Sequence, residues 1–226
     1  MGDAIGQTLP LAVGIAISPI GIIASVLMLG TRKAGSNGIS FLIGWMAGLL
    51  ALGGLLLLLN HGADASSEGN PADWTGYVRI VLGLILLDVA RRQWKKRPGK
   101  DGETELPAWM SKLDSFNPAR SAVAGVTLAA INPKNLILTA AAATAIAGTG
   151  TATGDQIVAL VTFTLIASLG AATPLGIYAF MGDRAAGLLE RLKESMARNG
   201  GVIMAVICVV IAAKLIGDGI TTLSLF

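Results

Sequence analysis

Several stretches of this chain are apolar over a length that the interior of a soluble domain does not require. A helix needs about 20 apolar residues to cross the roughly 30 Å hydrocarbon core of a bilayer. Residues 9–30, 39–60 and 156–181 each reach this length without a charged residue. The composition agrees, because 53% of the residues are hydrophobic, only 14% are charged and the mean hydropathy is +0.68, values unlike those of soluble domains. The sequence therefore predicts an integral membrane protein.

Two further stretches contain charges but are long and apolar enough to cross a membrane. Residues 121–148 contain Lys134, and residues 201–226 contain Lys214 and Asp218. Charged residues inside a membrane are costly, and they usually face a partner, a cavity or a functional site. We therefore predict that both stretches are spans that carry a paired or functional charge.

The sixth predicted span, residues 74–92, has the weakest pattern. Arg79 and Asp88 interrupt it. Trp74 and Tyr77 are nevertheless typical of residues that anchor a span at the membrane interface, and a dense basic run follows. With this segment, the sequence predicts an all-α integral membrane protein with six transmembrane helices.

The positive charges between the spans are distributed unevenly. Most of the 17 Lys and Arg residues lie at 32–33, 91–120 and 184–198. The alternate loops, 61–76 and 149–155, carry acidic residues instead. Because Lys and Arg accumulate on the cytoplasmic side of membrane proteins, we predict a multi-pass protein of the inner (plasma) membrane. Both termini would lie outside, and the three basic loops would be cytoplasmic.

The last basic segment, residues 185–198, has an amphipathic pattern. Leu188, Leu189, Leu192 and Met196 recur at helical spacing among charged residues. Such a pattern fits a short helix lying on the membrane surface. It fits equally well a cytoplasmic extension of the last span.

The chain divides into two halves that share a short pattern. Residues 1–97 form the first three-helix half, residues 98–117 form a cytoplasmic linker rich in Pro, Gly and charge, and residues 118–226 form the second half. Ala-Ile-Ser-Pro at 16–19 and Ala-Ile-Asn-Pro at 130–133 occupy similar depths in the first helix of each half. An odd number of spans per half gives the halves opposite orientations, so the sequence predicts two inverted three-helix repeats.

The two polar-Pro pairs are candidate breaks in their helices. Pro19 and Pro133 cannot donate a backbone hydrogen bond, so each leaves a carbonyl one turn earlier without its partner. Inside a membrane such carbonyls must be satisfied by other groups. Discontinuous helices at matching positions of two halves often mark a transport site, which makes Ser18, Pro19, Asn132 and Pro133 candidate substrate-binding residues. The alternative is that both prolines only bend their helices.

Lys134 and Asn135 follow the second pair directly, near the middle of their span. A cation at this depth costs about 2.5–3.5 kcal/mol on membrane-insertion scales, so Lys134 requires a partner. A buried carboxylate is one candidate. An anionic ligand is the other, because the start of a broken helix offers free N–H groups beside the ammonium.

The remaining charges inside the spans also have two interpretations. Asp88 can pair with Arg91 or Arg92, and Lys214 can pair with Asp218, since these spacings place side chains on one helix face. Alternatively, Asp88, Lys214 and Asp218 form an ion pair across the bundle or carry protons. The sequence does not decide between these interpretations.

Several classes of function lack their usual residues in this chain. There is no phosphate-binding GxxxxGK[ST] loop, no CxxC pair, and only one histidine, His61. We therefore expect no enzyme activity, no catalytic residues, no cofactor, no bound metal and no nucleic-acid partner. Gly44 and Gly48 form a small-residue motif that favours close helix packing and is compatible with a homodimer.

Ser18-Pro19-Ile20-Gly21, Asn132-Pro133-Lys134-Asn135, the basic central loop and the overall length resemble the lysine exporter superfamily of small six-span transporters. Within it, the chain is most similar to the glycolipid-addressing protein family, which includes sulfolipid-addressing proteins. The resemblance covers nearly the whole chain, although its motifs are short. It implies movement of cell-envelope glycolipids or their precursors across the inner membrane, alongside a larger lipid exporter. It also implies that Lys134 contacts the substrate, in a substrate-binding site made of Ser18, Pro19, Asn132, Pro133, Lys134 and Asn135.

These observations lead to one hypothesis and two alternatives. We expect a transporter or flippase-like helper for an anionic lipid or glycolipid, with no nucleotide hydrolysis of its own. One alternative is an exporter of a small solute, an amino acid or an ion, as elsewhere in the superfamily. The other is a non-transporting scaffold for a lipid export complex that uses Gly44, Gly48 and the basic loops.

Overall fold

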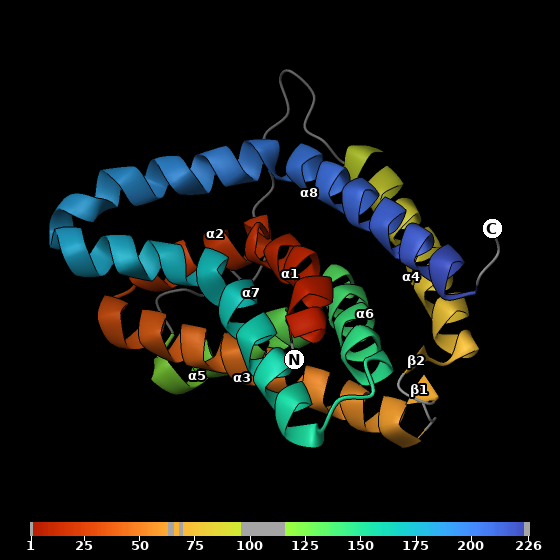
Figure 1. The fold of residues 1–226 in the computed structure, drawn as a ribbon. Coiled ribbons are helices and arrows are strands. Elements are labelled where there is room, and N and C mark those ends of the chain that lie inside the picture. Colours follow the sequence, from red (N-terminus) through yellow and green to blue (C-terminus); the bar gives the residue numbers. More distant parts are fainter. Residues whose placement is uncertain (1, 63–65, 68–69, 96–115, 224–226) are drawn as a thin grey trace.

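The structure is a computed structural model that describes residues 2–62, 66–67, 70–95 and 116–223. It is almost entirely helical (Figure 1), which confirms the predicted all-α class. The elements are α1 (Gly2–Ala16), α2 (Pro19–Leu29), α3 (Ala34–Gly62), β1 (Ser66–Ser67), β2 (Asn70–Pro71), α4 (Asp73–Lys95), α5 (Pro118–Ala130), α6 (Pro133–Gly148), α7 (Thr153–Met181), the 3₁₀ helix η2 (Gly182–Ala185) and α8 (Ala186–Thr222).

Both predicted polar-Pro breaks are present. Helices α1 and α2 meet at an angle of 53°, and α5 and α6 meet at 66°. Ser18 and Asn132 lie in extended conformations as the N-caps of α2 and α6, and Pro19 and Pro133 begin these helices. Proline is favoured at this position because a helix does not use its first N–H group. The same two prolines therefore end one helix and start the next.

Three helices are long and apolar enough to cross a membrane within the described part of the chain: α3, α7 and α8. The number rises to five if each bent pair is one span. Helix α4, which contains Arg79 and Asp88, is not among these candidates. The structure thus supports a membrane protein with three to five candidate spans, and the sixth span is not confirmed.

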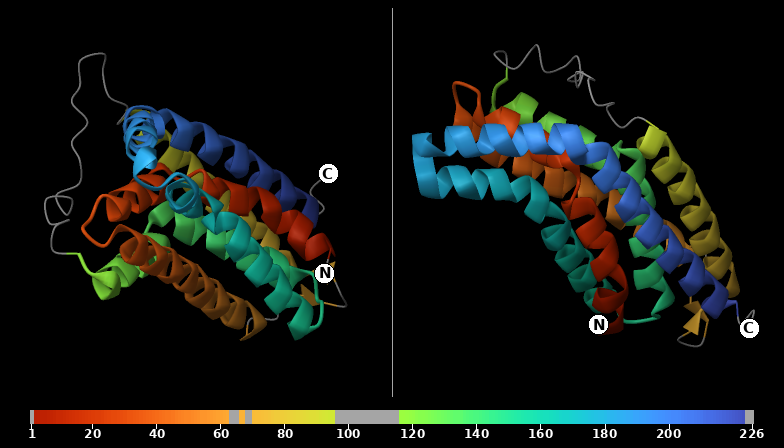
Figure 2. Two further views of the ribbon diagram at one scale, coloured as in Figure 1. Left: turned by 90° about the vertical axis from the view of Figure 1, so that its left-hand side faces the viewer. Right: turned by 90° about the horizontal axis from the view of Figure 1, so that it is seen from above.

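The helices pack in a small number of extended pairs. Helix α4 packs along α8, α3 packs along α5 and α6, and α7 packs along α1 and α2. Helix α6 is alanine-rich, is buried along most of its length and contacts α1, α3, α4 and α7. Figure 2 shows the N-terminus, the α6–α7 connection and the β1–β2 hairpin at one end of the molecule, and the α2–α3 and α7–α8 connections at the other. We call the second end the basic end, because Arg32, Lys33, Arg184 and Lys193 lie there.

Glycines allow two of these helix pairs to approach closely. A Cβ atom at Gly44 would lie 2.0 Å from the carbonyl oxygen of Ala122, and one at Gly170 would lie 1.7 Å from that of Ala16. Gly48 packs in the same way on Val126 of α5. The Gly44 and Gly48 motif therefore contacts α5 of the same chain, and α5 occupies the surface that the homodimer and scaffold hypotheses would need.

Helix α8 continues without interruption from Ala186 to Thr222. It changes direction along its length in Figure 1 but contains no connecting loop. Except for Ala185, which ends η2, the amphipathic residues 185–198 are therefore the beginning of the last long helix rather than a separate surface helix. Leu189 packs against Val26 and Leu29 of α2, with Leu192 beside them, which explains this part of the apolar face, whereas Leu188 is exposed.

Two features at the connections complete the fold. The strands β1 and β2 pair antiparallel, with Ser66 opposite Pro71 and Ser67 opposite Asn70, a hairpin that the sequence did not predict. Most of the predicted linker, residues 98–115, lies outside the described residues. The division into two halves at this linker stays a prediction.

The Gly170 contact gives a direct test of the fold. Gly170→Ala should lower the thermal stability of the detergent-purified protein by the equivalent of about 1–3 kcal/mol, because the new methyl group would overlap the Ala16 carbonyl. Gly176→Ala is the matched control on the same helix, since no atom lies within 4 Å of its Cβ position. This control should be neutral or stabilising by up to about 1 kcal/mol. Equal melting temperatures for the two variants would contradict the packing of α7 on α1.

Candidate functional site

The first helix break leaves one backbone carbonyl free at the end of α1. Pro19 has no N–H group to donate to the carbonyl of Ile15, and the N–H of Ser18 takes that role at 3.0 Å. In a continuous helix, the Ser18 N–H would instead bond the carbonyl of Gly14. The break therefore makes the Gly14 carbonyl available to a partner from elsewhere in the protein.

Lys134 provides that partner from the second half of the chain. Its Nζ atom donates a hydrogen bond of 2.7 Å to the Gly14 carbonyl oxygen. The lysine is 1% exposed, so the ammonium lies in the interior. The negative end of the α1 dipole favours a cation at this point. The two helix breaks, distant in sequence, are thus joined by one buried charge.

Side chains next to the second break bond the backbone groups that the break leaves without partners. Pro133 cannot donate to the carbonyl of Ala129, and Asn135 Nδ2 donates to this oxygen at 3.2 Å. The Oδ1 atom of Asn132 accepts a hydrogen bond from the backbone N–H of Lys134 at 3.1 Å, as an N-cap residue does. Asn132 and Asn135 therefore have structural roles at the break in addition to any contact with a ligand.

Lys134 lacks a carboxylate partner in the part of the chain that the structure describes. The ion pairs found there are Asp88 with Arg92, Glu190 with Lys193, and Asp218 with Lys214. A carbonyl supplies a dipole but no compensating negative charge. An ammonium also has three N–H donors, of which the Gly14 bond uses one. The described residues therefore supply no ion pair for Lys134, and its contact with a ligand stays a prediction.

A cavity of about 590 Å³ lies beside the second break. Its walls come from the start of α2, the second half of α4, the end of α5, the start of α6, and Met204 of α8. Isoleucines form much of the lining, among them Ile20, Ile85 and Ile131. Asn132 and Lys134 contribute polar groups on one side. A mainly apolar cavity with a few polar groups is typical of a site for a small molecule or an amphiphile.

Asp88 lies in this cavity, together with Arg92. The Arg92 Nε atom and the Asp88 Oδ2 atom are 2.7 Å apart, so the local pairing predicted from the sequence is present. The structure thus brings Asp88 to the same cavity as Asn132, Pro133 and Lys134. The ion pair on α4 and Lys134 of α6 therefore line one cavity, while the Lys134 Nζ atom is bonded to the Gly14 carbonyl.

Lys214 and Asp218 lie elsewhere. They pair with each other on α8, again as the local interpretation predicted. Arg79 of α4, which is 5% exposed, donates from Nη1 to the Thr222 hydroxyl at 3.2 Å. Neither Lys214 nor Asp218 lines the cavity at the second break. Of the two, Asp218 also interacts electrostatically with Arg79 of α4.

The first break is covered, unlike the second. Gly200 of α8 packs on Pro19, where a Cβ atom would lie 3.0 Å from the proline Cβ. Ser18 is 1% exposed, and its hydroxyl has no hydrogen-bond partner among the described residues. Lys134 therefore bonds to Gly14, in the turn before Ser18 and Pro19. Ser18 and Pro19 themselves do not line the cavity.

Sequence reasoning missed two residues of this arrangement. Gly14 contributes a backbone carbonyl, which no side-chain pattern reveals. Its position five residues before Pro19 was the available signal, because a proline break frees carbonyls in the preceding turn. Arg79 was treated only as an interruption of its span, although it is buried and bonded to Thr222. Its partner lies 143 residues away in the sequence.

The comparisons with known proteins give one match. The sequence model of the family described as Sap, sulfolipid-1-addressing protein, matches residues 8–221. The match includes both helix breaks and the residues of the cavity. Neither the comparison with curated proteins nor that with solved structures gives a significant match.

The role of Asn135 at the break can be tested with a double-mutant cycle. Asn135→Ala should lower stability by about 1 kcal/mol, because the Ala129 carbonyl loses its donor inside the protein. The loss should be smaller in a Pro133→Ala background, where the new backbone N–H at residue 133 can take the asparagine's place. Melting temperatures of the wild type, the two single variants and the double variant in detergent give the coupling between residues 133 and 135. Additive effects would show that Asn135 does not compensate for the proline.

Proposed function

The chain belongs to the sulfolipid-1-addressing protein family, and from this premise we propose that it moves an anionic lipid or glycolipid of the cell envelope across the inner membrane. It acts as a transporter or flippase-like helper and passes its substrate to a larger lipid exporter. The observation that carries the proposal is the buried Lys134 ammonium without a carboxylate partner among the described residues, at the edge of a largely apolar cavity.

The chemistry of the cavity supports an amphiphilic substrate. A charged head group and long hydrocarbon chains need opposite surroundings, and this cavity offers both. Lys134 and Asn132 can bind an anionic group, while Ile20, Ile85 and Ile131 can contact the chains. Ile131 is 71% exposed, so in a membrane it would face the lipid. An amphiphile can then keep its chains in the bilayer while its head group approaches Lys134.

The proposal includes an inverted repeat of two three-helix halves, as in the lysine exporter superfamily. The packing of α1 and α2 on α7 has its counterpart in the packing of α5 and α6 on α3, while α4 packs on α8. Ser25 and Thr139 each lie seven residues after the N-cap of their half. Both hydroxyls are buried without a partner among the described residues. These correspondences support an exchange of two related arrangements during transport.

The proposed orientation places the basic end in the cytoplasm and both termini outside. It follows from the distribution of Lys and Arg, which favour the cytoplasmic side. The grouping of the α2–α3 and α7–α8 connections at one end of the molecule supports it. In this orientation α4 also crosses the membrane, with Arg79 satisfied by Thr222 inside the protein.

Native mass spectrometry of the purified protein tests the role of Lys134. The wild-type protein, offered host lipid extract, should retain an anionic lipid or glycolipid selectively. Lys134→Met should reduce this retention by about tenfold or more, since a charge-assisted hydrogen bond is worth about 1.5–3 kcal/mol. Lys95→Met, which removes an exposed cation outside the cavity, is the control and should bind as the wild type does.

Two other outcomes would change the proposal. If the Lys134→Met variant retained as much lipid as the wild type and had the same melting temperature, Lys134 would not be a lipid-binding residue. The same protein should also be offered basic and neutral amino acids. Selective binding of one of these, lost in Lys134→Met, would support a small-solute exporter instead.

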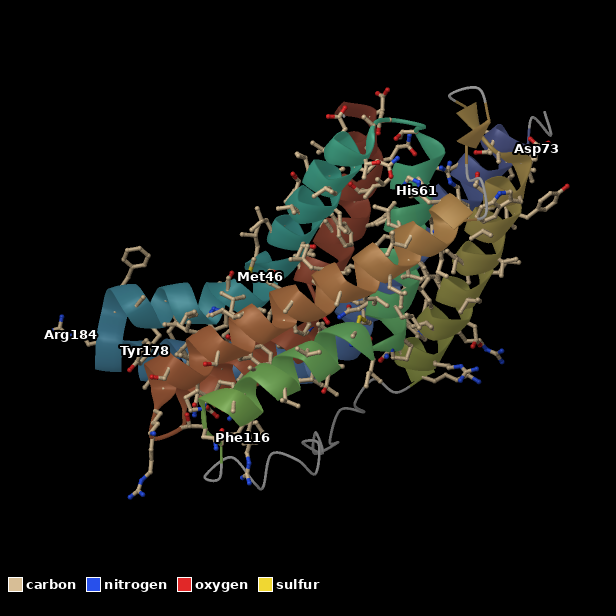
Figure 3. All side chains as sticks on the ribbon, turned by 90° about the horizontal axis from the view of Figure 1, so that it is seen from below. Met46, His61, Asp73, Phe116, Tyr178 and Arg184 are labelled. Carbon is tan, nitrogen blue, oxygen red and sulfur yellow. The ribbon has the colours of Figure 1, made fainter. Side chains whose placement is uncertain are left out.

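Single cysteines test the orientation. Cys208 is the only cysteine of the chain, so Cys208→Ala gives a background without thiols. Figure 3 shows Asp73 and Arg184 at opposite ends of the molecule. In intact cells an impermeant thiol reagent should label an Asp73→Cys variant at once, and an Arg184→Cys variant after permeabilisation only. The reverse pattern, or labelling of both in intact cells, would refute the orientation.

A further inference from the structure

A second cavity, of about 700 Å³, lies at the basic end of the molecule. The end of α2, the start of α3, the end of α7 and the start of α8 surround it. It shares no lining residue with the cavity at the second break. The lining is also different, because charged and polar side chains alternate here with aliphatic ones. This second cavity, which we call the basic-end cavity, needs an explanation of its own.

One wall of the basic-end cavity is apolar. Val26, Leu29 and Leu189 line it, and these residues form a small buried cluster with Ala185. The cluster is separate from the main hydrophobic core of the protein. The cluster packs α2 against the start of α8 and gives the cavity an aliphatic surface.

The other wall carries more positive than negative charge. Arg32 and Lys193 contribute two cations, and Glu190 contributes one carboxylate. Lys193 Nζ lies 2.6 Å from Glu190 Oε1, and the lysine side chain is only 18% exposed. Arg32 has neither an ion pair nor a hydrogen bond among the described residues. Its guanidinium therefore has its five N–H donors available to a ligand.

The backbone around the cavity also favours an anion. The carbonyls of Val26 and Leu27 accept hydrogen bonds from the Gly30 N–H, and the Met28 carbonyl accepts one of 2.6 Å from the Thr31 hydroxyl. These acceptors at the end of α2 are already in use. The first residue of α3, Ala34, lines the cavity, and the first N–H groups of a helix have no partner within it. The start of α3 therefore offers backbone donors, which suit an anion.

An aromatic ring completes the lining. Tyr178 lies near the end of α7 (Figure 3). Its Cε1 atom is 4.0 Å from the Cβ position of Gly35 at the start of α3. A tyrosine combines an apolar ring with a hydroxyl that can donate or accept a hydrogen bond. It can therefore contact both the polar and the apolar portion of an amphiphile.

From these features we propose that the basic-end cavity binds the phosphate or sulfate ester of an anionic amphiphile, which Arg32 and Lys193 contact directly. The aliphatic wall takes the part of the hydrocarbon that adjoins the head group. The inference rests on the proposed function and adds a separate loading site to it, on the side where the basic loops lie. Helix α2 borders both cavities, with Ile20 at one end and Val26 to Gly30 at the other, so it connects the two sites.

Photo-crosslinking separates this site from the one at Lys134. The full chain in nanodiscs should be irradiated with a phosphatidylglycerol that carries a diazirine near its head group, and the modified peptides identified by mass spectrometry. Crosslinks are expected within residues 26–34 and 186–193. Arg32→Gln should reduce them about tenfold, because the loss of one charge-assisted contact weakens binding by roughly that factor. Lys193→Gln should act in the same direction.

The control is Lys33→Gln, which removes the neighbouring exposed cation that does not line the cavity. It should crosslink as the wild type does at these two segments. Arg32 is exposed, so its substitution should leave the fold intact. Equal crosslinking in Arg32→Gln and Lys33→Gln would overturn the proposed loading site, whether or not Lys134 binds lipid.

A soluble competitor distinguishes the two sources of an ester. Glucose 6-phosphate carries the charged group but no hydrocarbon chain. At millimolar concentration it should compete only weakly with the lipid for the basic-end cavity. Complete loss of the crosslinks at 26–34 and 186–193 would assign the cavity to a soluble ester and overturn its assignment to an amphiphile.

Discussion

The bond between the Lys134 ammonium and the Gly14 carbonyl holds together the part of the structure on which the rest depends. One proline break separates α1 from α2 and another separates α5 from α6, and inside a bilayer each unsatisfied backbone group costs several kcal/mol. The second break satisfies the Ala129 carbonyl with Asn135. The first break leaves the Gly14 carbonyl to Lys134. The carbonyl freed at the first break is therefore satisfied by a residue from the second break, and the carbonyl freed at the second break by a residue next to it.

The two breaks differ in what surrounds them. Helix α8 covers the first break, where Gly200 packs on Pro19. The second break borders a cavity of about 590 Å³ that extends to Asp88 and Arg92 of α4. The proposed function gives this difference between the two breaks a role. In a transporter built of two inverted halves, the binding site opens to the other side of the membrane when the halves exchange their arrangements. Under that proposal, one covered break and one open break correspond to one of these two arrangements.

The sequence predicted the local features well and the long-range contacts poorly. Both breaks, and the pairs of Asp88 with Arg92 and of Lys214 with Asp218, follow from proline chemistry and helical spacing, which depend on neighbours in the chain. The partner of Lys134 is a backbone carbonyl 120 residues away, and a carbonyl leaves no mark in the residue pattern. The continuation of α8 through residues 185–198 was left open for a similar reason. It depends on the contact of Leu189 with α2.

The arrangement of charges explains why neither Asp88 nor Asp218 pairs with Lys134. Asp88 and Asp218 are the two carboxylates for which the sequence left an ion pair across the bundle open. Each of them already pairs with a basic residue on its own helix. Moving either carboxylate to Lys134 would leave Arg92 or Lys214 without its partner. The local pairs thus keep the two carboxylates away from the second break. The ammonium there is satisfied by one dipole, and an anion that enters the cavity gains an interaction that no described side chain of the protein already makes.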